Sequence, residues 1–361
     1  MLKKAAALLL VCASMGAWLG CGTTKSRYLY ASLPGGAGGG EIVAYREDPN
    51  AGVLTQLAGS PIAAGAAVES LAIHPSGKYL YAANSGSNNI SQYTISSTGA
   101  LTEVGSRANA GNSPTLLVID KAGAFLYAAN SGSEDISVYS IDSGTGLLSP
   151  VSQTSGTTAP TGLQALNMAL TPSGNSLYVT GQGQFGYVEE FPISSGVLGA
   201  PVTGSPFVTG NGPNGLAIDT SGSFLYTANT IDGTISEFTV NADGSLSLIQ
   251  TLGESYSSPT GLLIDNSGKY LYVANRGSTN VAAYSVGSDG GLTLLTNSPF
   301  ATGTSPTILA TDSSGKFFFV GTQSSQSSQI QSFTLDPGSG TLTSVATYPI
   351  GANPTSIVIT P

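Results

Sequence analysis

The feature that most constrains this chain is a unit of sequence that recurs seven times. Each copy contains a segment such as "KYLYVAN", and its central aromatic recurs at spacings of 51, 46, 51, 48, 46 and 47 residues. A second aromatic follows 12 to 15 residues later, with an Ile or Val three residues before it. Self-similarity at such a period is typical of folds assembled from repeated structural units. The two aromatic columns are Tyr30, Tyr81, Tyr127, Tyr178, Tyr226, Tyr272 and Phe319, and Tyr45, Tyr93, Tyr139, Phe191, Phe238, Tyr284 and Phe333.

Each repeat predicts four β-strands. In the sixth copy they are "SPTGLLID" (258–265), "YLYVAN" (270–275), "NVAAYSV" (280–286) and "LTLLT" (292–296). Gly, Asn, Asp and Ser fill the connections, as tight turns require. Apolar residues occupy both alternation phases of "YLYVAN", so both faces of that strand are expected to be buried. Radially packed four-stranded sheets bury strands in this way, and we therefore predict an all-β, seven-bladed β-propeller with antiparallel blades.

The two ends of the repeat array predict how the ring closes. The first "YLY" segment, at 28–30, has no Pro-Thr strand before it. The last segment, "NPTSIVITP" (353–361), is a Pro-Thr strand with nothing after it. The C-terminal strand is therefore expected to complete the N-terminal blade, which leaves no open sheet edge. We predict a single propeller domain over residues 27–361.

The N-terminal segment has the pattern of an export signal. Residues 1–21 have a basic start, an apolar run shorter than the ~20 residues that span a bilayer, and small residues before Cys21. The ending "WLGC" resembles a bacterial lipoprotein box. We expect a lipid on Cys21, a tether over 22–26, and a membrane-anchored protein facing the periplasm or the cell surface. An ordinary signal peptide cut nearby is the alternative.

Composition excludes several classes of function. Net charge is −9, and removing Lys3 and Lys4 with the leader leaves −11, so neither nucleic acid nor an anionic surface is an expected partner, and contact with the membrane is expected through the N-terminal lipid only. Cleavage at Cys21 would also remove Cys12 and leave no thiol for a disulfide or zinc site. The only histidine, His74, occupies a column held by Asp in other copies, where bonding the turn backbone is its expected role. A Ser-His-Asp triad and a histidine metal site are thus excluded.

Loop content distinguishes the two ends of the predicted propeller. Antiparallel blades send alternate connections to opposite faces of the ring. The "SGK" and "DGG" turns share one face and are short and monotonous. The connections after "YLYxAN", and those before the Pro-Thr strands, share the other face and vary in length and content. Function is expected on this second face.

Three charged residues on that face are candidates for catalysis. Arg276 follows the Asn of the sixth copy, where it suits a carboxylate or the oxyanion of an opening lactone, or caps loop carbonyls or pairs with Glu254. Glu69 is the only ionisable residue in the column that begins the innermost strands, and Glu69 or Glu254 would serve as general base. Four asparagines either close turns or surround a ligand or a calcium ion, namely Asn84, Asn130, Asn229 and Asn275.

The units "HPSGKYLYAANSGSNNISQYTI" and "DNSGKYLYVANRGSTNVAAYSV" resemble the seven-bladed lactonase family, which includes 6-phosphogluconolactonases and carboxymuconate-cyclising enzymes. They also resemble the "YVTN" repeats of bacterial surface proteins. Arg276 matches the family's "NRG". Family enzymes look to have Arg and His after the Pro of a loop entering an inner strand, whereas "NGPNGLAI" here has Asn214 and Gly215.

Two functions remain open from the sequence. The first is an exported hydrolase of a neutral or weakly acidic sugar lactone, with Arg276 as the electrophilic residue. The second is a non-catalytic envelope propeller that binds glycan or protein through the same face. No cofactor is expected beyond the calcium alternative.

Overall fold

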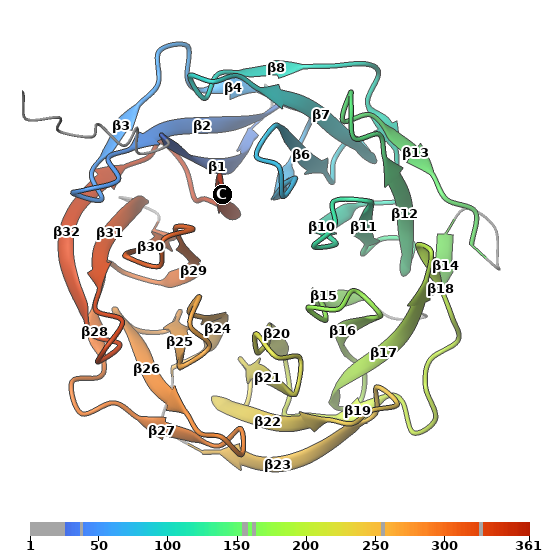
Figure 1. The fold of residues 1–361 in the computed structure, drawn as a ribbon, viewed down its shortest axis with the longest axis vertical. Helices are drawn as coiled ribbons and strands as arrows, with labels where there is room; N and C mark the ends of the chain where they lie inside the picture. The colour runs from blue at the N-terminus through green and yellow to red at the C-terminus, as the bar shows by residue number, and fades with distance from the viewer. Residues whose placement is uncertain (1–25, 37–38, 154–157, 161–163, 254–256, 325–327) are drawn as a thin grey trace, which may run out of the picture.

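The computed structural model is a ring of seven β-sheets around a central axis (Figure 1). This confirms the predicted seven-bladed propeller. None of the described residues is helical, and they contain no helix long and apolar enough to cross a membrane. The leader and Cys21 lie outside the described residues, which are 26–36, 39–153, 158–160, 164–253, 257–324 and 328–361.

Each blade places four strands side by side from the axis outward, and blades are numbered from the one that contains the first strand. The innermost strands of blades 1 to 7 are β33 (Ser356–Ile359), β5 (Val68–Ile73), β10 (Pro114–Ile119), β15 (Ala165–Leu170), β20 (Pro213–Ile218), β24 (Pro259–Ile264) and β29 (Pro306–Thr311). The second strands are β1 (Arg27–Gly36), β6 (Tyr79–Asn84), β11 (Phe125–Asn130), β16 (Ser176–Gln182), β21 (Phe224–Asn229), β25 (Tyr270–Asn275) and β30 (Phe317–Thr322).

The outer half of each blade is less regular. The third strands are β2 (Gly39–Glu47), β7 (Asn89–Ile95), β12 (Asp135–Ile141), β17 (Gly186–Ser194), β22 (Thr234–Val240), β26 (Asn280–Val286) and β31 (Gln329–Leu335). The fourth strands are β3 (Leu54–Gln56), β8 (Leu101–Glu103), β13 (Leu148–Pro150), β18 (Val197–Leu198), β23 (Leu246–Leu252), β27 (Leu292–Leu294) and β32 (Leu342–Pro349). Five blades pair a further short segment with the third strand, namely β4 (Ile62–Ala63), β9 (Ala108–Asn109), β14 (Thr158–Pro160), β19 (Phe207–Val208) and β28 (Phe300–Ala301).

The repeated tyrosines connect neighbouring blades. The Tyr226 hydroxyl donates to the carbonyl of Gly290 at 2.8 Å, in the outer turn of the next blade. Such turn glycines have positive φ, and a Cβ on Gly99 would lie 2.2 Å from the Tyr28 ring. The repeated residues thus determine how neighbouring blades pack against each other, as well as the strands within each blade. Equivalent bonds join Tyr30 to Gly99, Tyr81 to Gly146, Tyr178 to Gly244 and Tyr272 to Gly340.

Strand pairing closes the ring as predicted, and buried ion pairs lie beside the closure. The C-terminal β33 pairs antiparallel with β1, so one blade contains both ends of the described chain. Beside it, Arg27 Nη1 lies 2.9 Å from Asp312 Oδ2 in blade 7 and 3.6 Å from Glu47 Oε1 in blade 1. Both carboxylate side chains are fully buried, so the guanidinium balances charges that water does not reach.

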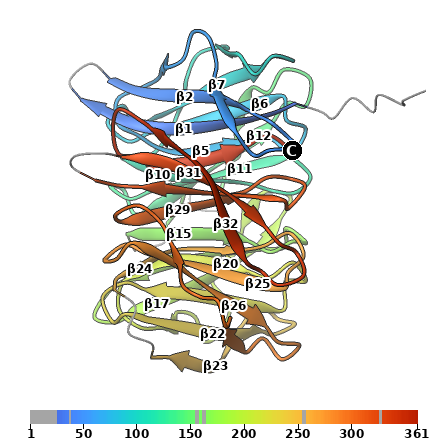
Figure 2. The ribbon, with the colours of Figure 1, turned by 90° about the vertical axis from the view of Figure 1, so that its left-hand side faces the viewer.

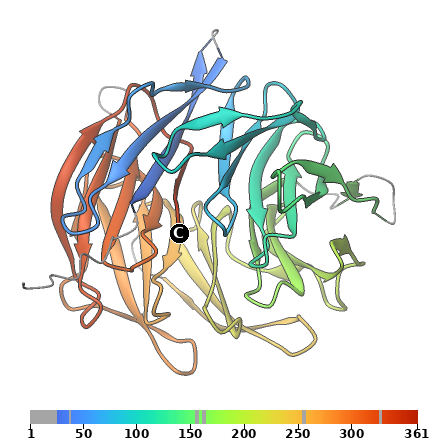
Figure 3. The same cartoon turned by 45° about the horizontal axis from the view of Figure 1, so that its top comes forward.

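The ring has two unlike faces, seen edge-on in Figure 2 and obliquely in Figure 3. We call one the turn face; it contains the inner turns, such as 266–269, and the outer turns, such as 287–291. The C-terminus lies on this face. We call the other the variable face; it contains the loops between second and third strands, such as 276–279, and the segments entering the innermost strands, such as 303–305.

Candidate functional site

On the variable face, a β-bulge opens the innermost strand of six blades. In blade 6, Pro259 pairs with Asn275 and Gly261 with Ala274, which leaves Thr260 as the extra residue. Bulges of this kind reorient a side chain out of the regular ladder. We call the residues at this position the bulge column, and all of them are half-buried: Glu69, Thr115, Leu166, Asn214, Thr260, Thr307 and, in blade 1, Thr355.

A second set of residues, the rim column, follows the second strands on the same face. The backbone N–H groups of five of them bond to the segments entering the innermost strands, as Arg276 N does to Ser258 O at 3.0 Å, and the sixth, Gln182, is the last residue of the second strand β16. Ser258 is held at a φ of 52°, and the equivalent residues in blades 2, 3, 5 and 7 also have positive φ. The rim column is Ser85, Ser131, Gln182, Thr230, Arg276 and Gln323.

Rim side chains reach across to the next blade. Thr230 Oγ1 donates to Pro259 O at 2.6 Å, and Gln323 Nε2 donates to Pro354 O at 2.9 Å. The rim column therefore borders the ends of the innermost strands, close to the ring axis. Arg276 belongs to the mouth of the ring rather than to its outer edge.

Arg276 differs from its rim neighbours in having no fixed side-chain partner among the described residues. It is exposed, and it forms no salt bridge with a described carboxylate. In the bulge column, the hydroxyls of Thr260 in blade 6, Thr307 in blade 7 and Thr115 in blade 3 are shielded and also lack a described partner. Buried polar groups without partners are uncommon in folded proteins, so the bulge column has unused hydrogen-bonding capacity.

Glu69 lies on the same mouth but in a different part of the ring. Burial raises the pKa of its carboxyl above the ordinary value, and a hydrogen bond with Ser85 partly offsets that rise. A raised pKa suits a general base that works near neutral pH. Blade 2, which holds Glu69, is separated from blade 6 by blades 7 and 1, so the structure does not place Glu69 against Arg276. Glu254 lies outside the described residues.

The asparagines that end the second strands are buried within their blades. Asn229 Nδ2 donates to Thr234 Oγ1 and to Ser236 Oγ, both at 2.9 Å. These partners are third-strand side chains rather than the turn backbone that the sequence suggested. Since their amide hydrogens are donated to side chains of the same hairpin, stabilising that hairpin accounts for these asparagines better than binding a ligand does. The four residues are Asn84, Asn130, Asn229 and Asn275.

His74 has the structural role predicted for it. Its Nδ1 accepts from Ser76 N at 3.1 Å, and its Nε2 donates to Gly123 O of the next blade at 2.9 Å. Elsewhere Asp265 Oδ1 fills the same position by accepting from Lys269 N and Tyr270 N. Within the part of the chain that the structure describes, no group of three or more His, Cys, Asp or Glu is placed to hold a metal ion.

Sequence reasoning missed the contribution of the threonines to this site. The pattern predicts that the "SPT" segments begin strands, but it does not single out Thr260 and Thr307. The sequence does contain a signal, because "SPT" recurs at 113–115, 258–260 and 305–307. Only the strand register shows that the threonine is the bulged residue.

Comparisons with known proteins agree with this architecture. A family model described as "Lactonase, 7-bladed beta-propeller" matches residues 39–165 and 165–359. A candidate 6-phosphogluconolactonase from Bacteroides fragilis is 23% identical, with a TM-score of 0.76 over 94% of this chain and 99% of that one. A periplasmic gluconolactonase from Pseudomonas aeruginosa is 21% identical, with a TM-score of 0.74 over 93% and 99%. A search of curated protein sequences finds no match. Since the family match spans most of the chain, the protein belongs to the seven-bladed β-propeller lactonase family.

Proposed function

We propose that this protein is an exported lactonase that hydrolyses an unphosphorylated sugar lactone at the mouth of the variable face. One observation carries the proposal. Arg276 is the only cation of the rim column, and its guanidinium has no described partner in a ring of hydroxyl and amide side chains. A cation without a protein partner is available to stabilise an oxygen that gains negative charge during the reaction.

The chemistry requires one water and two protein groups. The Glu69 carboxylate removes a proton from water as the water oxygen bonds to the lactone carbonyl carbon. Arg276 stabilises the oxyanion that forms on the carbonyl oxygen. The ring C–O bond then breaks, and the leaving ring oxygen takes the proton back from Glu69. The product is the open-chain hydroxy acid. Because Glu69 and Arg276 come from the non-adjacent blades 2 and 6, this step requires both side chains to extend toward the ring axis and to contact the same carbonyl group there.

The side chains of the mouth support a sugar without a phosphate. Hydroxyl and amide groups exchange hydrogen bonds with sugar hydroxyls, and they dominate both the bulge column and the rim column. A phosphate dianion is usually held by several Arg or Lys groups, whereas these two columns contain one. The similar protein from Pseudomonas aeruginosa is a periplasmic gluconolactonase. Together with the leader and Cys21, this supports action outside the cytoplasm on a neutral lactone.

A non-catalytic propeller that binds envelope glycan or protein is the second candidate. The separation of Glu69 from Arg276 favours it, because no described carboxylate contacts the guanidinium. The same mouth would then bind a sugar through Arg276 and the hydroxyl groups without breaking a bond.

Lactone hydrolysis by the mature chain tests the proposal. Gluconolactone, other aldonolactones and gluconolactone 6-phosphate would be compared by acid release at constant pH. We expect kcat/KM for a neutral lactone to exceed that for the phosphorylated one at least tenfold. Hydrolysis no faster than the uncatalysed rate, with aldonate binding still seen by calorimetry, would establish the binding propeller instead. A preference for the phosphorylated lactone would refute the substrate assignment.

A further inference from the structure

Large apolar side chains are exposed on the variable face in one part of the ring. Phe185 is 55% exposed, Val208 65% and Ile231 71%. Phe185 belongs to the 183–185 loop of blade 4, Val208 to β19, and Ile231 to the 230–233 loop of blade 5. Blades 4 and 5 are neighbours in the ring (Figure 1). Among the described residues, the other exposed large apolar side chains lie on outer strands or in outer turns, namely Val53, Leu147, Leu248, Ile249 and Leu294.

The segment 209–212, which leads from β19 into β20, brings these side chains close together. Its first N–H donates to the carbonyl of Gly186, the residue after Phe185, at 2.9 Å. Ile231 N donates to a carbonyl of the same segment at 3.1 Å, and a Cβ on the last glycine of the segment would lie 2.8 Å from Ile231 Cγ1. Phe185 and Ile231 therefore border one short segment, and Val208 directly precedes it.

Leu166 extends this apolar region toward the ring axis. It is the only apolar member of the bulge column, and it lies half-buried in blade 4. The next residue, Asn167, donates from Nδ2 to Asn214 O at 2.7 Å, which joins this strand to blade 5. Apolar side chains that gather at an exposed surface typically mark a binding site, because water solvates them poorly. We call the four residues the apolar sector, namely Leu166, Phe185, Val208 and Ile231.

The polar side chains beside the apolar sector have partners within the protein. Asn214 Nδ2 donates to Thr230 Oγ1 at 2.8 Å, and Thr230 Oγ1 donates to Pro259 O at 2.6 Å. The Asp232 carboxylate accepts from the backbone N–H and the side-chain amide of Asn211 at 2.7 and 3.0 Å. These bonds reduce the hydrogen-bonding capacity that is left for sugar hydroxyls. What this part of the mouth offers to a ligand is mainly hydrocarbon.

The apolar sector adjoins the part of the mouth that contains Arg276. Ile231 follows Thr230, whose hydroxyl is bonded to Pro259 O in blade 6. Pro259 in turn follows Ser258, whose carbonyl accepts from Arg276 N at 3.0 Å. Blades 5 and 6 are neighbours in the ring (Figure 1). A ligand bound at Arg276 therefore reaches the apolar sector by extending across one blade boundary.

The size and shape of the apolar sector suit an aliphatic chain. Its exposed side chains offer roughly a few hundred Å² of apolar surface, whereas a stable protein interface buries about 800 Å² on each partner. The sector extends over two blades, so it suits an elongated group better than a compact one. Its side chains contain no polar atom, and the group that binds there has none to match.

We propose that the sugar lactone hydrolysed by this protein carries an aliphatic chain, which binds on the apolar sector while the lactone carbonyl lies at Arg276. The inference rests on the lactonase activity proposed above and specifies its substrate. Complete burial of one methylene strengthens binding about fourfold. The chain thereby supplies binding energy to a lactone that has no phosphate.

The experiment measures how chain length affects binding and hydrolysis by the mature chain. Gluconates that carry a methyl, butyl or octyl ether at O6 would be bound in calorimetry, and the matching lactones would be hydrolysed, all below their critical micelle concentrations. Ethers are used because a hydrolase of carboxylic esters does not cleave them. Since the sector is open to solvent, each methylene is buried only in part, and we expect Kd to fall at least tenfold from methyl to octyl. The kcat/KM of the lactones should rise by a similar factor.

A variant that combines Phe185→Ser and Ile231→Ser should weaken binding of octyl gluconate at least fivefold and change binding of methyl gluconate less than twofold. The unchanged methyl ether shows that the rest of the mouth is intact. Leu248→Ser combined with Leu294→Ser is the matched control. It removes side chains that are 56% and 45% exposed on outer strands, and it should alter neither affinity.

Equal Kd values along the series, or a chain-length effect that persists in the Phe185→Ser and Ile231→Ser variant, would overturn the proposal. A dimer in ultracentrifugation that dissociates in that variant would also overturn it, because a second copy would then cover the sector. Binding that strengthens with chain length while no lactone is hydrolysed would support the apolar sector and refute the lactonase. Hydrolysis of gluconolactone without any effect of chain length would do the reverse.

Discussion

The two faces of the ring are made from the same repeat, yet they treat polar groups in opposite ways. On the turn face, polar side chains are largely committed to the protein. Asp265 accepts from two backbone N–H groups of its own turn, and Tyr272 donates to Gly340 O in the next blade. On the variable face, Arg276 and the hydroxyls of Thr260 and Thr307 lack described partners.

This difference separates stability from function. Groups with fixed partners position the blades and resist substitution because their loss leaves a buried donor or acceptor unpaired. Groups without fixed partners contribute little to folding and remain available to a ligand. In a repeat protein, a column that changes residue type from blade to blade therefore indicates a site, as the bulge and rim columns do here.

The largest expected effect comes from removing the unpartnered cation. Arg276→Ala should lower kcat/KM for a neutral lactone by about 10²–10³-fold, because one donor to the oxyanion is lost. Its melting temperature should change little, since Arg276 is exposed. Lys269→Ala removes a cation from the turn face of the same blade and serves as the matched control. Equal activity loss in both variants would contradict the separation of the faces.

A smaller loss of activity is expected from Glu69→Gln. We expect kcat/KM to fall by about 10²-fold, the range of a lost general base. Burial raises the pKa of Glu69, so wild-type activity should rise with pH as this carboxyl ionises. The variant should lack that rise. Glu41→Gln, at an exposed position on the same face, is the control. An unchanged pH profile in Glu69→Gln would exclude Glu69 as the base.

Glycine substitution on the turn face should affect stability instead of activity. Gly99 has a φ of 81°, and its Cβ would lie 2.2 Å from the Tyr28 ring, so Gly99→Ala should lower the free energy of unfolding by about 3 kcal/mol. Gly174 has a φ of 74° with nothing within 4 Å of its Cβ, so Gly174→Ala should cost about 1 kcal/mol. Urea unfolding measures both, and a similar loss in the two variants would show that the Tyr28 contact is unimportant.

The smallest effect is expected at a buried carboxyl between blades 5 and 6. Glu237 Oε2 accepts from Gln250 Nε2 and Leu292 N, and burial raises the pKa of this carboxyl. Its favourable protonated form is present below the unfolded pKa and is lost as pH rises through the folded pKa. Glu237→Gln should therefore stabilise the fold by about 1 kcal/mol at pH 8 and by little at pH 4. Destabilisation at pH 8 would contradict this assignment.

Gln92 shows how a neutral side chain fills the equivalent position in blade 2. Its Oε1 accepts from Leu148 N at 2.6 Å, and its Nε2 donates to Ser106 O at 2.7 Å. The natural glutamine thus supplies both a donor and an acceptor where Glu237 supplies acceptors only. This comparison is the physical reason for expecting a gain from the amide.

The sequence predicted the fold well because period and alternation are local signals. The aromatic spacings gave the number of blades, and the unpaired Pro-Thr segment at 353–361 gave the closure. Contacts between blades could not be predicted from the sequence. Tyr226 and Gly290, and likewise Arg27 and Asp312, are far apart along the chain, and no local pattern pairs them. These depend on how neighbouring sheets rotate about the axis.

The candidate site was predicted only in part, for a related reason. Arg276 was recognised because it departs from its column in the repeat. The bulge that sets Thr260 beside it depends on strand register, and the distance around the ring from blade 2 to blade 6 keeps Glu69 apart from it. A pattern of residue types predicts neither the strand register nor the distance between two blades.

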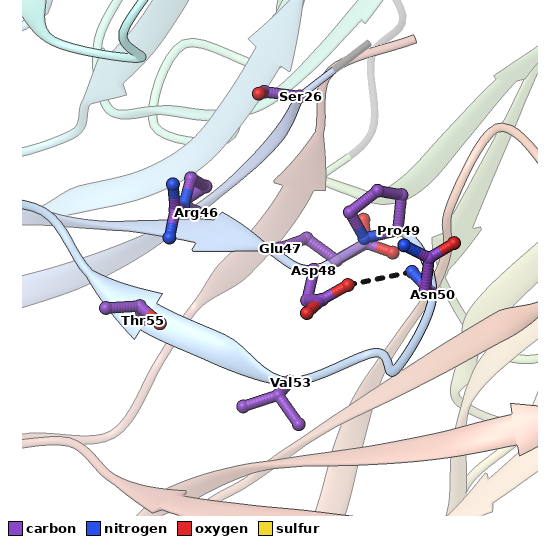
Figure 4. A pocket seen from close by; sticks show the side chains of 8 residues that line it. All are labelled: Ser26, Arg46, Glu47, Asp48, Pro49, Asn50, Val53 and Thr55. Atoms are coloured by element: carbon purple, nitrogen blue, oxygen red, sulfur yellow. Dashed lines mark hydrogen bonds between the residues drawn. The ribbon is translucent and has the colours of Figure 1, made fainter. Parts of the chain in front are cut away.

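A crystal structure of the mature chain soaked with an aldonate, the expected reaction product, tests the central claim most directly. We predict electron density at the mouth of the variable face, with the carboxylate bonded to Arg276 and sugar hydroxyls near Thr260 and Thr307. Density confined to the turn-face pocket lined by Ser26, Arg46 and Asp48 (Figure 4), or a mouth in which Arg276 contacts no ligand at saturating aldonate, would contradict the account.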